Sequence, residues 1–350
     1  MIPVLATADE ALVHISAYYY PWYHSDGRHW SEGYSGKTEG NGPKTGEYSS
    51  RDPETIVQQV KWSHQGGISN WICAWWGKES WEDVTLQYRV APVLNQVTDA
   101  DQKHPVTFCI FYESEGLLGL DPSKGIEFNG KVTRKFLDDF GYLSDTYFSH
   151  PAYYRIEGRP VVYLYLTRTW TGNYRNAIDL ARAAAGIRGF ELFLVGDEVY
   201  WGEPDENRIK LFDAITSYNM HGPEPVFEDS GDWTPFLQQA GDVYKKYKNV
   251  AGQLGVQFIP GIMPGFNSHG ADPTRAHYII PREFRTGTGE KKVFLKEMIK
   301  TARPTLDGKI RSIAVTSFNE WHEGTQIEPS RNDEERFPVL YDLSTGEFPD

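Results

Sequence analysis

The chain has 350 residues, a formal net charge of -13 and a hydrophobic fraction of 39%. Such an acidic chain is a poor partner for nucleic acid or an anionic membrane surface. Its apolar runs are far shorter than the roughly 20 residues that a membrane-spanning helix needs. We therefore expect no nucleic-acid partner and no membrane span.

Eight strand-length apolar runs recur along the chain, and most are apolar almost throughout. This is typical of strands that are covered on both faces. The runs begin at Val13, Asn70, Val106, Pro160, Glu191, Ala214, Phe258 and Ser312.

Segments with a helical pattern lie between most of these runs. The first is the clearest, because Asp52 is a good N-cap, Pro53 suits the first helical position, and Gly66 follows the last turn. The other expected helices span residues 80–97, 130–148, 171–189, 232–255 and 289–308. Only a short polar segment follows the fifth run.

Alternating strands and helices favour parallel pairing, and eight such units favour a closed barrel. We predict an α/β fold in which residues 1–350 form a single (β/α)8 TIM barrel with long loops at its C-terminal face. The alternative is a doubly wound sheet. That fold often has a G-x-G-x-x-G turn after its first strand, and this chain has none there.

Active sites of such barrels gather at the carboxyl ends of the strands. The residues expected there are mostly aromatic or acidic, which suits a sugar with apolar C–H faces and a rim of hydroxyls. We expect them to face one mouth, although a large ordinary aromatic core remains an alternative. They are Tyr18 to Tyr20, Trp75, Trp76, Tyr112, Glu113, Tyr163, Tyr165, Asp197, Glu198, Tyr218, Asn219, His221, Met263, Pro264, Asn319 and Glu320.

The motifs that several other kinds of site require are incomplete in this sequence. The pair His322-Glu323 begins like the zinc motif H-E-x-x-H, but Gln326 occupies the position of the second His. The acidic pair Asp197-Glu198 has no spacing typical of a metal loop. Cys73 and Cys109 lie in apolar runs and are expected to be buried, reduced thiols. We expect no metal and no cofactor.

A pair of carboxyl groups remains as the candidate reaction centre. Glycoside hydrolysis needs one carboxyl that protonates the leaving oxygen and a second group for the anomeric side. Glu320 and Glu323 follow the last strand, and the neighbouring ring of Trp321 could help to raise the pKa of a general acid. Glu113 and Glu198 are competing candidates, and one member of the first pair could instead be structural.

Three segments together resemble glycoside hydrolase family 99, the endo-acting α-mannosidases and α-mannanases. "FNEWHEGTQIEPS" (Phe318 to Ser330) is similar to the most specific motif of the family. "YYYPWYHSDGRHW" (from Tyr18) and "HPAYYRIEGRPVVYLY" (from His150) resemble its first-strand motif and the approach to its fourth strand.

The resemblance implies a (β/α)8 barrel that needs no cofactor and retains the anomeric configuration. It also implies that the 2-hydroxyl of the sugar attacks C1 and forms a 1,2-anhydro sugar. Glu320 matches the base that acts on O2, and Glu323 matches the general acid/base.

The resemblance also implies a set of substrate-binding residues. Tyr18 and His29 match positions that line the subsite of the cleaved sugar, and Glu113 matches a carboxylate that contacts substrate. Either Trp76 or Trp75 matches a residue that packs on the next sugar. The remaining expected substrate-binding residues are Trp30, Tyr165, Tyr218, Asn319, Trp321 and His322.

The leading hypothesis is thus a monomeric, retaining endo-α-mannosidase or mannanase that acts on an oligo- or polysaccharide. One alternative is another α-glycan, possibly anionic, contacted by Arg28, Lys78 or the segment from Thr274 to Arg285. Another is a non-catalytic carbohydrate-binding barrel. The resemblance suggests a secreted, periplasmic or cell-surface protein, although residues 1–20 lack the features of a signal peptide.

Overall fold

The computed structural model describes residues 12–96, 105–222, 231–273, 279–332 and 336–346. The strands of its main sheet pair in parallel, except for one short antiparallel pairing between residues 155–156 and 159–160. The strands run in the order β10-β9-β8-β6-β3-β2-β1-β14-β11. These strands are β1 (His14–Tyr19), β2 (Ile68–Trp75), β3 (Thr107–Tyr112), β6 (Arg159–Leu164), β8 (Phe193–Asp197), β9 (Ala214–Thr216), β10 (Gln257–Ile259), β11 (Gly261–Ile262) and β14 (Ser312–Val315).

The two ends of this order meet at Pro260. β10 pairs with β9, and β11 pairs with β14 on the other side. Proline has no N–H to donate to the ladder, so the seventh predicted strand is divided there into two short parts. The carbonyl of Pro260 still accepts a hydrogen bond from the N–H of Ala314 (3.1 Å). The sheet therefore closes into the predicted (β/α)8 barrel.

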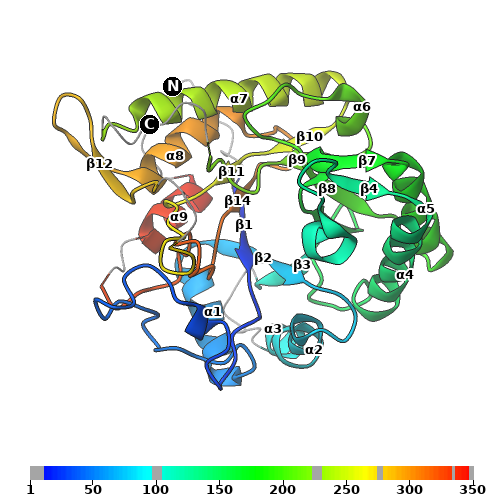
Figure 1. Ribbon diagram of the computed structural model, residues 1–350, viewed down its shortest axis with the longest axis horizontal. Coiled ribbons are helices and arrows are strands. Elements are labelled where there is room, and N and C mark those ends of the chain that lie inside the picture. Colours follow the sequence, from blue (N-terminus) through cyan, green and yellow to red (C-terminus); the bar gives the residue numbers. More distant parts are fainter. Residues whose placement is uncertain (1–11, 97–104, 223–230, 274–278, 333–335, 347–350) are drawn as a thin grey trace, which may run out of the picture.

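Helices surround the strands, as Figure 1 shows. α1 begins at Pro53, and its N-cap Asp52 accepts hydrogen bonds from the backbone N–H groups of Glu54 and Thr55, as expected from the sequence. The helices are α1 (Pro53–Gln65), α2 (Trp81–Thr85), α3 (Ala91–Gln96), α4 (Gly130–Thr146), α5 (Tyr174–Ile187), α6 (Glu206–Ile209), α7 (Thr234–Gln253), α8 (Phe294–Ala302) and α9 (Arg336–Thr345).

Some elements differ from the predicted pattern. A π-turn at Leu86–Val90 separates α2 from α3. The expected helix 289–308 begins only at α8, because Lys291–Val293 forms β13 and pairs antiparallel with β12 (Glu283–Arg285). Three further short strands, which the sequence patterns did not suggest, are β4 (Ile126–Phe128), β5 (Arg155–Ile156) and β7 (Trp170–Gly172).

The aromatic residues form two buried clusters. The main core lies inside the barrel and between its strands and helices, and it includes the unpaired thiols of Cys73 and Cys109. A second cluster lies under the loop that follows β1 and consists of Tyr23, Trp30, Tyr34, Tyr48 and Trp321. Much of the aromatic content is thus explained by packing. Three of the strand-end aromatics expected at the mouth point toward the surrounding helices instead, because Tyr19, Trp75 and Tyr112 hydrogen-bond to Gln59, Asp83 and Asp139.

Within the described residues, no helix is both long enough and apolar enough to cross a membrane.

Candidate active site

The segment that follows β14 folds back on itself and brings its acidic residues to the carboxyl end of the barrel. The backbone N–H of Ser317 donates to the carbonyl of Thr325 (2.8 Å), and that of Glu328 donates to the carbonyl of Phe318 (2.7 Å). The backbone N–H of Phe318 in turn donates a hydrogen bond to the carbonyl of Tyr18 in β1 (2.7 Å). We call residues 317–328 the catalytic loop, because Glu320 and Glu323 lie in it.

Glu320 is buried, with 2% of its surface exposed. Its Oε1 accepts a hydrogen bond from the backbone N–H of His322 (2.9 Å) and lies 3.2 Å from Nδ1 of the same residue. Its own N–H donates to Oγ of Ser317 (2.8 Å). The carboxyl is therefore fixed in one orientation beside a basic group, which suits a base.

Glu323 is partly exposed and lies beside the hydroxyl of Tyr218. Its Oε2 accepts a hydrogen bond from Tyr218 Oη (3.4 Å), and that hydroxyl is 2.5 Å from Oη of Tyr20. The carbonyl of Glu323 accepts from the N–H of Asn267 (2.6 Å), so the loop after β11 supports its backbone. Glu323 has the access to a substrate that Glu320 largely lacks.

Glu113, which directly follows β3, lies near Glu320 and Glu323. Burial raises the pKa of Glu113 well above its ordinary value, and the negative charges of Glu115, Glu320 and Glu323 raise it further. Burial raises the pKa of Tyr20, and the charges of Glu113, Glu320 and Glu323 raise it further. Tyr20 therefore lies near the same carboxyls. The structure thus brings three predicted site carboxyls together.

The competing candidate Glu198 is held in a salt bridge. Arg208 Nε donates to both oxygens of this buried carboxyl (3.0 and 2.7 Å). Its neighbour Asp197 accepts from Arg168 Nη1 (2.5 Å) and from the backbone N–H of Tyr218 (3.0 Å). These carboxylates orient the ends of β8 and β9. Burial raises the pKa of Glu198 to about 7, although Arg208 lowers it, and both oxygens of this carboxyl are already bonded to Arg208.

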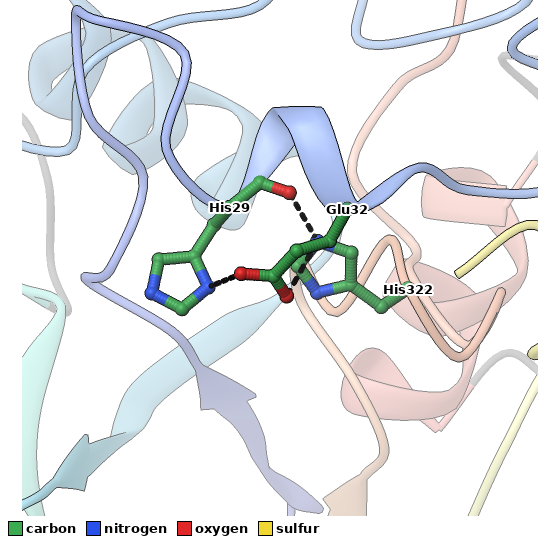
Figure 2. A group of neighbouring side chains, drawn as sticks. All are labelled: His29, Glu32 and His322. Carbon is green, nitrogen blue, oxygen red and sulfur yellow. Dashed lines mark hydrogen bonds and ion pairs between the residues drawn. The ribbon is translucent and has the colours of Figure 1, made fainter. Parts of the chain in front are cut away.

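His29, Glu32 and His322 come together from two loops (Figure 2). Their potential ligand atoms lie within 4.8 Å of one another, so the residue types could in principle hold a metal ion. However, His322 Nε2 is 2.8 Å from the carbonyl oxygen of His29, which can only accept a hydrogen bond. Nε2 therefore carries a proton here, and the arrangement favours a hydrogen-bonded chain over a metal centre.

The two neighbouring tryptophans point in opposite directions, as successive residues at a strand end do. Trp75 is fully buried, and its indole N–H donates to Asp83 Oδ1 (2.8 Å). Trp76 is 39% exposed and packs over Gly116, where a Cβ would meet its ring. Of the two residues predicted to pack on a sugar, only Trp76 has the required exposure.

Several other predicted substrate contacts are buried against protein partners. Trp30 donates to the carbonyl of Tyr48 (2.7 Å), and Trp321 donates to Glu328 Oε2 (2.8 Å). Asn319 clamps the end of β1, with Oδ1 accepting from the N–H of Tyr20 (2.7 Å) and Nδ2 donating to its carbonyl (3.1 Å). The polar groups of these three side chains are taken up by protein partners, so these residues support the site, and their contacts with sugar stay predictions.

The remaining predicted contacts form the floor and wall of the site. Tyr18 is fully buried, its ring lies against those of Phe111 and Tyr218 (4.7 and 4.9 Å), and its hydroxyl has no hydrogen bond within the described chain. Tyr165 is half-buried and contacts Tyr218 edge-on (5.1 Å). His29 is 30% exposed and stacks on Trp22 (5.2 Å). Their contacts with sugar stay predictions.

Sequence reasoning placed Tyr20 only among the strand-end residues, and Arg282 only in the segment expected to contact an anionic glycan. Arg282 Nη2 donates to the carbonyls of Gly324 and Gln326 (2.7 and 3.0 Å), so it fastens the catalytic loop to the segment before β12. Residues 274–278 of the segment expected to contact an anionic glycan lie outside the described residues. No local sequence motif predicts either role, because both roles depend on contacts between distant segments.

Glu328 has a structural role. It is fully buried and accepts hydrogen bonds from Gln59 Nε2 (2.7 Å), Tyr48 Oη (2.8 Å) and Trp321 Nε1 (2.8 Å). Burial raises its pKa to about 7, although these hydrogen bonds lower it. Glu328 thereby ties the base of the catalytic loop to α1 and to the second aromatic cluster.

The fold is shared with solved glycoside hydrolases. A glycoside hydrolase-like protein matches with a TM-score of 0.74 and 19% identity, over 100% of this chain and 97% of that one. A GH99 endo-alpha-mannosidase from Bacteroides thetaiotaomicron matches with a TM-score of 0.63 and 20% identity, over 96% of this chain and 97% of that one. At this identity, the likeness establishes the barrel fold alone.

Curated relatives are similar over most of this chain. The glycoprotein endo-alpha-1,2-mannosidase of Rattus norvegicus is 24% identical over 298 residues, covering 82% of this chain and 56% of the relative. An endo-alpha-1,2-mannosidase-like protein of Danio rerio is 26% identical over 304 residues, covering 82% and 58%. The chain thus spans just over half the length of these relatives. The model of glycosyl hydrolase family 99 matches residues 38–342, and the chain belongs to this family.

Proposed function

We propose that the protein is a retaining endo-α-mannoside hydrolase in which Glu320 and Glu323 carry the reaction. The observation that carries the proposal is the contrast between the two carboxyls of one loop. Glu320 is buried and held beside His322, whereas Glu323 is partly exposed beside Tyr218. Such different surroundings allow one carboxyl to act as a base while the other exchanges protons with substrate and water.

In the first step, the Glu320 carboxylate takes the proton from the 2-hydroxyl while O2 attacks C1. Glu323 donates its proton to the glycosidic oxygen as the C1–O bond breaks, which leaves a 1,2-anhydro sugar. An axial 2-hydroxyl, as in mannose, can lie trans to an axial leaving group, so this route suits an α-mannoside.

In the second step, the Glu323 carboxylate takes a proton from water as that water attacks C1. The epoxide opens, and O2 takes back its proton from Glu320. Both carboxyls return to their starting states, and two inversions at C1 give net retention. In this proposal, Glu113 and Tyr20 hydrogen-bond hydroxyls of the same sugar, and the exposed ring of Trp76 packs on the neighbouring sugar.

A product profile on defined glycans tests this function. The panel should contain a yeast-type α-mannan, an α-mannose-rich N-glycan and an anionic polysaccharide. We expect oligosaccharides from within the α-mannoside chains and no release of single terminal sugars. Cleavage of the anionic polysaccharide alone would replace the substrate assignment, and binding without turnover would favour a carbohydrate-binding barrel.

A further inference from the structure

We propose that His322 is a positioning residue that holds the Glu320 carboxyl aimed at its substrate, and that the loop carrying His29 and Glu32 holds His322 in this role. His29, Glu32 and His322, drawn in Figure 2, continue to Glu320 and so form a chain from the surface to the proposed base. This inference rests on the proposed function, since it concerns the base of that reaction.

The outer part of the chain is the short 3₁₀ helix Trp30–Glu32 and its N-cap, His29. His29 has a φ of 65°, a left-handed conformation uncommon for residues other than glycine. Its carbonyl accepts from His322 Nε2 (2.8 Å), and its Nδ1 lies 3.1 Å from Glu32 Oε1. One unusual turn therefore presents both a carbonyl and a carboxylate to His322.

The inner part of the chain is the contact between His322 and Glu320. With Nε2 protonated for the carbonyl of His29, Nδ1 faces Glu320 Oε1 at 3.2 Å. A doubly protonated imidazole satisfies both contacts, since it donates from each nitrogen. Glu320 Oε1 is then held between Nδ1 and the backbone N–H of His322 (2.9 Å), which fixes the direction of the carboxyl.

The surroundings of His322 agree with a cation. Four titratable groups face its ring: Glu320, Glu32 at 4.0 Å from Nε2, His29, and Tyr23 with a ring separation of 5.9 Å. Burial lowers the pKa of His322, but the contacts with Glu320, the carbonyl of His29 and the charge of Glu32 raise it to about 9. Two of these four neighbours are carboxylates, and the ring is 9% exposed.

The first test follows the His322 ring directly and needs no substrate. Proton NMR of the full chain, with the His322→Gln spectrum for assignment, should give a titration midpoint near pH 9 for His322. Glu32→Gln should lower that midpoint, whereas Glu39→Gln, an exposed change in the same loop, should leave it unchanged. A midpoint near the ordinary histidine value in the wild type would overturn the proposal.

The second test uses the rate of α-mannan hydrolysis. His322→Gln cannot donate to both Glu320 and the carbonyl of His29 from one rigid ring. We expect kcat to fall by roughly 100-fold, as for a misplaced catalytic group, with little change in KM. His150→Gln, at the other end of the barrel beside Phe108, is the matched control.

The outcomes separate this inference from the proposed function. If the wild type hydrolyses α-mannan but His322→Gln lowers kcat no more than His150→Gln does, His322 is merely structural and the inference is wrong. If the NMR result holds but no hydrolysis occurs, the proposed function is wrong. If a chelator removes the difference in kcat between wild type and His322→Gln, the residues bind a metal and the inference fails.

Discussion

Glu320 and Glu323 differ in burial and partners, and this difference makes their roles separable by single substitutions. Glu320→Gln and Glu323→Gln should each lower kcat by about 10²–10⁴-fold, the usual contribution of a general acid or base. Gln can still accept the hydrogen bond from the N–H of His322, so the fold should survive. Turnover of each variant and its thermal unfolding midpoint check both expectations.

Glu39→Gln provides the matched control for these changes, because Glu39 is exposed and lies in the loop after β1. It should leave kcat within about twofold of the wild type. Near-normal rates for both active-site variants would remove Glu320 and Glu323 from the reaction.

Protonation of His322 should also affect stability. Its folded-state pKa of about 9 is above the ordinary value of 6.5, so the folded protein holds this proton more tightly than the unfolded chain does. The resulting stabilisation, up to about 3 kcal/mol, is complete below pH 6.5 and is lost as pH rises through about 9. Denaturant unfolding of wild type and His322→Gln at pH 6.5 and 9.5 measures it. An equal difference at the two pH values would contradict the expectation.

For individual residues, the sequence predicted which residue types gather at the site better than it predicted the directions in which their side chains point. The residues of the "EWHEG" segment were placed at a reaction centre, and Glu320, Glu323 and His322 do come together with Glu113. Trp30 and Trp321 were also expected at the substrate but are buried, because their indole N–H groups bond to partners far along the chain or across a tight loop. A motif identifies such residues without specifying which side of the loop they face.

Among the elements, the catalytic loop depends on a glycine at its tip. Gly324 has a φ of 65°, and a Cβ there would lie 2.9 Å from the carbonyl oxygen of Asn267. Gly324→Ala should therefore destabilise the fold by roughly 1–2 kcal/mol and should also lower kcat, since Glu323 is the preceding residue. Gly186→Ala in α5 is the control, because nothing lies within 4 Å of its added Cβ and alanine favours a helix. Equal stability of the two variants would contradict this account of the loop.

Element boundaries were predictable where local chemistry decides them. The Asp52 cap and Pro53 placed the start of α1 correctly, because the capping hydrogen bonds involve only the next few residues. The β12–β13 hairpin was missed because "KKVF" continues smoothly into the helical pattern of α8. Its pairing with β12 is a longer-range contact that helical periodicity does not report.

For the whole molecule, the alternation of apolar strands and helices was sufficient to predict a closed parallel barrel. The catalytic end of the barrel follows from this topology, since β14 lies beside β1 and carries the catalytic loop to the same end as Tyr20 and Glu113. The aromatic content was less informative, because burial in the main core, and to a smaller extent in the second cluster under the β1 loop, accounts for much of it.

Time-resolved proton NMR of the hydrolysis of an α-mannan oligosaccharide tests the central claim most directly. With Glu320 as base for O2 and Glu323 as acid/base, the new reducing end should appear first as the α-anomer and only later equilibrate with the β-anomer. Initial appearance of the β-anomer would contradict the two-step mechanism and the roles of both carboxyls.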